Sequence, residues 1–202
     1  MPGSGATEAR INVWWLPVGA GGHVVIHTSR WWELIQARKE RRAPRPLFHA
    51  ALEVFVGDVP HLIEMAPAWG VPGPSRGVVA TGPVGVRWLG WSRFFRYEVR
   101  CWADGILPDR ASAVDSPVSF PLAEGEAQSL LARVGTVPRL TWGRDTLGCG
   151  DMWNSNSLVS WLLMAAGVDA TQISPPEGGR APGWAAGVAA AQHAAPTEET
   201  PR

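Results

Sequence analysis

Hydrophobic and polar residues alternate along several short stretches of the chain, and this two-residue period predicts β-strands. The clearest case is residues 94–102, where apolar residues at 95, 97, 99 and 101 alternate with charged residues at 96, 98 and 100. Gly57 and Asp58 separate two further apolar stretches and predict a hairpin turn. The remaining predicted strands are residues 11–16, 23–27, 49–56, 61–65 and 77–89.

Apolar positions recur with a helical period in three other segments, residues 28–42, 122–134 and 154–166. Thr28 or Ser29 is a suitable cap for the first of these helices, and Gly167 closes the last. Residues 103–119 show neither period and are interpreted as irregular. Because strands and helices occupy both ends of the sequence, the pattern predicts an α+β fold.

The chain length of 202 residues fits one domain. We place this domain at residues 11–185, after a flexible N-terminus at residues 1–10. Residues 186–202 are rich in alanine, lack large apolar residues at a helical period, and are predicted to form a disordered tail.

The overall charge balance favours no bulk electrostatic partner. Lysine and arginine total 18, as do aspartate and glutamate, so the net charge of zero favours neither nucleic acid nor an anionic membrane as a bulk electrostatic partner. A basic cluster between Arg38 and Arg45 is interpreted as a solvated helix end and loop. The sequence contains no run of about 18 apolar residues, so no membrane span is predicted. The first ten residues lack the order of a signal peptide, so a cytoplasmic protein is expected.

Metal and thiol chemistry are weakly indicated. Cys101 and Cys149 do not have metal-ligand spacing and are too few for a disulfide framework. His23 and His27 lie four residues apart on a predicted strand and therefore on one face. A zinc pair is conceivable there, but no acidic or cysteine partner follows at a recognisable spacing, and core or edge histidines are the preferred interpretation. We predict no metal and no cofactor.

The entrance to the helix at residues 154–166 is the main candidate site. Four small polar residues, Asn154-Ser155-Asn156-Ser157, precede a fully apolar helix. Any one of them is explained as a helix cap. A hydroxyl at this place also gains from the helix dipole, and the N–H groups of the first turn can stabilise an oxyanion. A serine still needs a base within hydrogen-bond reach.

His49 is the predicted base, because it begins an apolar strand and can project from the end of the sheet. Glu64 lies on the partner strand of the hairpin, where a carboxylate can hold the imidazole tautomer. The alternatives are a strand-end histidine and an exposed carboxylate without chemistry. His61 is a secondary candidate for the base, and Cys149, in a glycine-rich loop, ranks below Ser155 as nucleophile.

The order of these motifs resembles the permuted papain-like fold of lecithin retinol acyltransferase-like and NlpC-type proteins. Residues 47–67 look like the strand pair that carries the family's base and third polar residue, and residues 154–159 look like the start of its nucleophile helix. The helix predicted at residues 122–134 falls where the family has a preceding helix. The resemblance implies a papain-like antiparallel sheet packed against helices. It departs from the family where Ser155 replaces the nucleophilic cysteine and Glu64 replaces the usual histidine.

The resulting hypothesis is a hydrolase or acyltransferase that acts on an amide or ester, with a small molecule, a peptide or a lipid acyl group as substrate. Ser155 attacks the carbonyl, His49 removes its proton and Glu64 orients His49. The predicted substrate-binding residues are Trp153, Trp69, Asn154 and Asn156. The alternative is a binding module that kept the fold and lost the reaction, since serine is a weaker nucleophile than cysteine.

Overall fold

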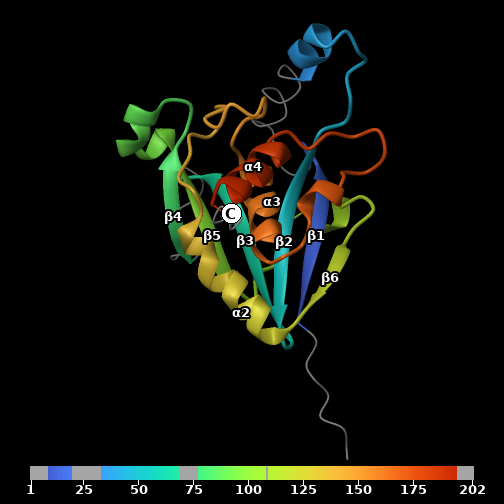
Figure 1. The fold of residues 1–202 in the computed structure, drawn as a ribbon, viewed down its shortest axis with the longest axis vertical. Helices are drawn as coiled ribbons and strands as arrows, with labels where there is room; N and C mark the ends of the chain where they lie inside the picture. Colours follow the sequence, from blue (N-terminus) through green and yellow to red (C-terminus); the bar gives the residue numbers. More distant parts are fainter. Residues whose placement is uncertain (1–8, 20–32, 69–76, 108, 195–202) are drawn as a thin grey trace, which may run out of the picture.

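The computed structural model describes residues 9–19, 33–68, 77–107 and 109–194. They form an α+β structure whose centre is one six-stranded antiparallel sheet with the strand order β4-β5-β3-β2-β1-β6. Figure 1 shows this sheet as a twisted layer behind the helices. The strands are β1 (Ala9–Pro17), β2 (Phe48–Val56), β3 (Val59–Pro67), β4 (Val78–Pro83), β5 (Arg96–Ala103) and β6 (Val118–Leu122).

Three helices cover one face of this sheet: α2 (Glu124–Arg133) and α3 (Ser155–Ala165) contact the strands, and α4 (Trp184–Ala194) packs on α3 (Figure 1). Alternate residues of the strands, such as Leu52 of β2 and Ile63 of β3, point into the core beneath these helices. The intervening residues form a smaller core on the opposite face, where Leu107 from the loop after β5 packs among residues of β1 to β3. The two-residue period predicted this division into two faces.

The helix α3 is buried on nearly its whole circumference, which explains its continuous apolar sequence. It lies between the sheet and α4. Gly187 of α4 makes this contact close, because a Cβ at that position would collide with the Ser157 carbonyl and the Ser160 hydroxyl of α3. The Asp151 carboxylate accepts from the backbone N–H groups of Gly183 and Ala185 and so holds the start of α4.

The strands β2 and β3 are paired along only part of their length. The ladder runs from Val56 opposite Val59 to Leu52 opposite Ile63 and ends there. Beyond that point β3 continues along β5, while the free edge of β2 at residues 48–50 meets the N-terminus of α3. This divergence of the two strands determines the position of the candidate site.

Most predicted elements are present, with corrections at four places. The strand predicted at residues 77–89 ends at Pro83 and is followed by two short 3-10 turns, η1 (Arg87–Trp91) and η2 (Arg93–Phe95). The stretch 103–119 was interpreted as irregular, but it contains η3 (Arg110–Ser112) and the beginning of β6. The predicted strand at residues 23–27 lies outside the described residues, as do residues 28–32 of the predicted helix; residues 33–39 are helical.

The prediction of a disordered tail is wrong for residues 186–194, which belong to α4. The helix escaped prediction because its buried positions are the small residues Ala186, Gly187 and Ala190, which give no pattern of large apolar side chains. At the other end, Ala9 and Arg10 of the predicted flexible segment belong to β1.

The basic residues between 38 and 45 lie on an exposed helix end and loop, as predicted. Within this segment Arg42 is paired with Glu33 and Glu40. None of the helices formed by the described residues has the length and apolar character needed to cross a lipid bilayer.

Candidate active site

Ser155 and His49, which are 106 residues apart in the sequence, meet at the N-terminus of α3. The Ser155 Oγ lies 2.8 Å from the His49 Nδ1. In the tautomer that carries its proton on Nε2, the imidazole accepts a hydrogen bond from the serine hydroxyl. This is the contact expected between a nucleophile and its base. Ser155 is buried, with 8% of its surface exposed to solvent.

Asn154 is the N-cap of α3. Its side-chain oxygen accepts from the Asn156 N–H at 2.8 Å, and its own N–H donates to the Ser157 Oγ at 2.9 Å. The Ser157 N–H is bonded to the Asn154 carbonyl. Of the three N–H groups at residues 155–157, only that of Ser155 lacks an acceptor in the part of the chain that the structure describes. One backbone donor, not several, therefore remains for an oxyanion.

Asn156 fixes the distance between α3 and β2. Its amide oxygen accepts from the Ala50 N–H at 2.7 Å, and its amide nitrogen donates to the Phe48 carbonyl at 3.0 Å. These two backbone groups flank His49 on the edge of β2 that no longer pairs with β3. The Asn156 side chain thus takes the place of a neighbouring strand. It also donates to the Pro182 carbonyl at 2.8 Å, so its hydrogen-bonding capacity is used within the protein.

Burial determines the protonation state of His49. Desolvation lowers its pKa from 6.5 to about 4, and the nearby carboxylate of Asp109 opposes this shift only in part. The imidazole is therefore neutral at pH 7, which is the form that can accept the Ser155 proton. A base with so low a pKa is weaker than one matched to neutral pH.

Glu64 does not meet His49 as predicted. Its Oε1 accepts from Arg100 of β5 at 3.3 Å, and the same guanidinium is bonded to Glu98. The reason is the divergence of β2 and β3: Glu64 lies one residue beyond their last pair and remains in register with Arg100. The prediction assumed that the hairpin stayed paired as far as His49.

Asp109 is the carboxylate that the sequence did not reveal. It precedes η3 in the loop that covers the smaller core, and its negative charge acts on the His49 imidazole. Its place depends on the packing of the neighbouring Leu107 under the sheet. No local pattern in the sequence marks such a contact, because residues 103–119 show no regular period.

Only one of the two predicted aromatic walls, Trp153, lies within the described residues, and it is buried away from any groove. Trp153 is 1% exposed and belongs to the main core, so it does not line an open groove. Trp69 lies outside the described residues. A shallow hollow of about 610 Å³ lies between β6 and residues 168–174 and includes neither Ser155 nor His49.

The secondary candidates lie elsewhere. His61 pairs with Val54 of β2, five residues from His49 and so roughly 16 Å along the strand. Cys149 is on an exposed loop, with its backbone N–H bonded to Asp145. His23 and His27 lie outside the described residues. Among the described residues, no three side chains of the metal-binding types come together to form a metal site.

The chain matches no protein-family model, no curated protein and no solved structure.

Proposed function

We propose that this protein is a serine hydrolase or acyltransferase of papain-like fold that acts on an amide or ester bond. The single observation that carries the proposal is the 2.8 Å contact between the Ser155 Oγ and the His49 Nδ1 at a helix N-terminus. A serine beside a neutral imidazole is the minimal arrangement for nucleophilic acyl transfer. The order of the sheet hairpin and the buried helix along the chain is compatible with the papain-like part of the proposal.

The reaction follows from the positions of these groups. The Ser155 Oγ attacks the carbonyl carbon of the substrate while His49 Nδ1 takes the hydroxyl proton. The Ser155 N–H, at the positive end of α3, donates to the oxyanion that forms. Collapse of this intermediate expels the amine or alcohol, which takes the proton from His49, and leaves an acyl-serine. Water completes hydrolysis, or a second alcohol or amine completes transfer.

Asp109 takes the role that the sequence assigned to Glu64. Because His49 Nδ1 faces Ser155, the proton of the neutral ring resides on Nε2, and a carboxylate nearby favours this tautomer and stabilises the imidazolium that forms during attack. Asp109 supplies that charge without a direct hydrogen bond to the ring among the described residues. It is a positioning residue in this proposal.

The second candidate is an inactive binding module, and three observations favour it. The pKa of His49 is low for a base, one backbone donor serves the oxyanion, and Ser155 is largely shielded. The loss of one oxyanion donor alone costs an enzyme about two to three orders of magnitude in rate. The same contact between Ser155 and His49 would then serve to hold α3 on the sheet.

Labelling with a fluorophosphonate separates the two candidates. We expect the full chain to form one covalent adduct, mapped by mass spectrometry to Ser155, and both Ser155→Ala and His49→Gln to abolish it. Ser129→Ala is the matched control, because this exposed serine of α2 bonds only to the Gly125 carbonyl. Labelling of wild type should rise with pH around pH 4 and stay constant above pH 6, following the pKa of His49. If folded wild-type protein is not labelled at any pH in this range, the binding module is the correct candidate.

A further inference from the structure

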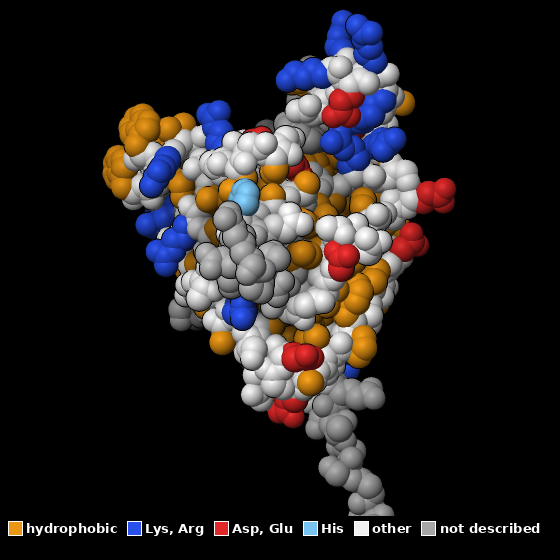
Figure 2. Space-filling model, viewed as in Figure 1, with side chains coloured by type: hydrophobic (Ala, Val, Ile, Leu, Met, Phe, Trp, Pro, Cys, Tyr) orange, Lys and Arg blue, Asp and Glu red, His pale blue; other side chains and the backbone are white. Residues whose placement is uncertain are grey.

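The two 3-10 turns after β4 carry a group of solvent-exposed aromatic side chains. We call residues 87–95 the aromatic tip. Trp88 is 73% exposed, Trp91 79% and Phe94 68%, and Phe95 is also exposed. Together they present on the order of 500 Å² of apolar surface, a size that is often functional on a monomer. The tip protrudes from the upper end of β4 (Figures 1 and 2).

Backbone hydrogen bonds hold the aromatic tip in a defined conformation. The Val84 N–H donates to the Phe95 carbonyl at 2.7 Å and closes the base of the tip. Within it, successive N–H groups donate to carbonyls three residues back, and the Arg144 guanidinium binds the Gly85 carbonyl at 2.7 Å. Its exposed tryptophans are therefore held outward by a defined structure. None of the residues in η1 or η2 is buried in the described part of the chain.

The charge of this segment is entirely positive. Arg87 and Arg93 are exposed within the tip, and residues 83–97 contain no aspartate or glutamate. Tryptophan with arginine is the composition that favours the headgroup region of a bilayer, where the ring is half-desolvated and the cation meets phosphate. A symmetric contact between two copies would instead bring the same arginines of both tips together.

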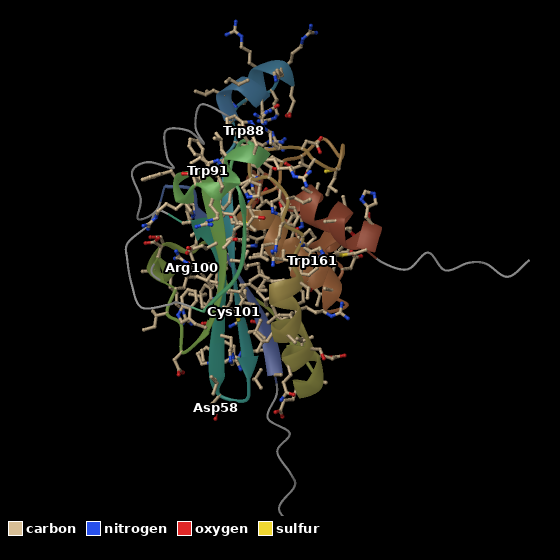
Figure 3. All side chains as sticks on the ribbon, turned by 90° about the vertical axis from the view of Figure 1, so that its left-hand side faces the viewer. Asp58, Trp88, Trp91, Arg100, Cys101 and Trp161 are labelled. Carbon is tan, nitrogen blue, oxygen red and sulfur yellow. The ribbon has the colours of Figure 1, made fainter. Side chains whose placement is uncertain are left out.

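The rest of this end of the molecule adds to the positive charge. Figure 3 places Trp88 and Trp91 at the end of the sheet opposite to Asp58. The exposed residues Arg38, Lys39, Arg41 and Arg45 lie on the segment at that same upper end, where Figure 2 shows lysine and arginine side chains gathered. A net charge of zero therefore conceals an uneven distribution, which the total over the sequence could not reveal.

We propose that this end of the protein docks on an anionic phospholipid bilayer, with Trp88, Trp91 and Phe94 inserted among the headgroups and the arginines bound to phosphate. The binding would be interfacial and reversible, since its apolar part is a short convex tip. His49 begins β2 at the same end of the sheet, opposite to the Gly57–Asp58 turn.

Vesicle co-sedimentation of the full chain tests the docking without reference to catalysis. The probes are sucrose-loaded vesicles of phosphatidylcholine alone and of phosphatidylcholine with 30% phosphatidylserine, at low and at physiological salt. We expect binding to the anionic vesicles that weakens as salt rises. Trp88→Ala/Trp91→Ala should lower the partition coefficient at least tenfold. Arg87→Gln/Arg93→Gln should lower it roughly twentyfold or more on the anionic vesicles, about fivefold for each arginine.

Two matched controls use exposed residues outside the tip. Ile106→Ala removes an exposed apolar side chain and Arg133→Gln an exposed cation of α2; both should leave the partition coefficient within twofold of wild type. Circular dichroism checks that all variants are folded, which the exposure of the replaced side chains favours. The docking proposal is overturned if the wild-type protein sediments with neither kind of vesicle. It is also overturned if the tip variants have the same partition coefficient as wild type. Sedimentation that shows a dimer abolished by Trp88→Ala/Trp91→Ala, without vesicle binding, assigns the tip to self-association instead.

The outcomes for docking and catalysis are independent. If Ser155→Ala binds vesicles as well as wild type does, and wild type is not labelled by the fluorophosphonate, the docking proposal stands and the proposed function falls. Labelling of Ser155 without vesicle binding would do the reverse.

Discussion

Replacement of Asn156 by alanine tests the account of how Ser155 reaches His49. The side chain makes three hydrogen bonds, to the Ala50 N–H and to the carbonyls of Phe48 and Pro182. The Pro182 carbonyl keeps a partner in the Asn154 amide at 2.8 Å. The two groups of β2 lose theirs while remaining buried. Each unsatisfied buried group costs about 1–3 kcal/mol, so the expected loss of unfolding free energy is about 4 kcal/mol.

Such a loss is a large share of the stability of a typical domain, about 5–15 kcal/mol. Urea denaturation followed by circular dichroism measures it directly, and the melting temperature should fall by roughly 10 °C. Gln128→Ala is the control, because this amide is exposed on α2 and bonds only to Glu124. Its cost should stay within about 0.5 kcal/mol. A loss below about 1 kcal/mol for Asn156→Ala would refute the idea that this side chain substitutes for a strand.

Because the folded-state pKa of His49 is about 4 and the unfolded value is 6.5, the unfolded chain binds the extra proton between these values. Wild type should therefore lose up to about 3 kcal/mol of unfolding free energy as the pH falls from 6.5 to 4, and His49→Gln should lack this component in the same denaturation series. Gly187→Ala should cost about 1–3 kcal/mol in thermal unfolding, since its Cβ would collide with α3, whereas Gly125→Ala, which meets nothing in α2, should be neutral or stabilising. Asp151→Ala removes the acceptor at the start of α4 and should cost about 1–2 kcal/mol, with hydrogen exchange accelerated in α4 and unchanged in α2; equal exchange in both helices would contradict this role.

Local patterns predicted the parts of the fold whose stabilising residues lie within one segment. The alternation in β5 and the hairpin at Gly57 were visible because strand period and turn chemistry act over a few residues. The beginning of α3 was predicted because Asn154 caps the helix from the adjacent position. The contact of Ser155 with His49 was predicted from two motifs, a polar helix entrance and a histidine at the start of an apolar strand, whose order along the chain also resembles that of papain-like proteins.

Three of the errors involve a partner distant in sequence. The carboxylate of Glu64 was placed correctly on its strand, yet the strand leaves β2 before reaching His49 and keeps Glu64 beside Arg100. The acceptor that starts α4 is Asp151, about thirty residues before the helix that it caps. The approach of Asp109 to His49 requires the loop at Leu107 to fold under the sheet.

The same hydrogen bonds that assemble the candidate site also limit its chemistry. Asn154 stabilises α3 by accepting from the Asn156 N–H, and this removes a donor that an oxyanion would otherwise use. Burial holds His49 against Ser155 and at the same time lowers the pKa of the imidazole to about 4. A substrate that enters this site must therefore gain much of its transition-state stabilisation from one N–H group and from its own placement.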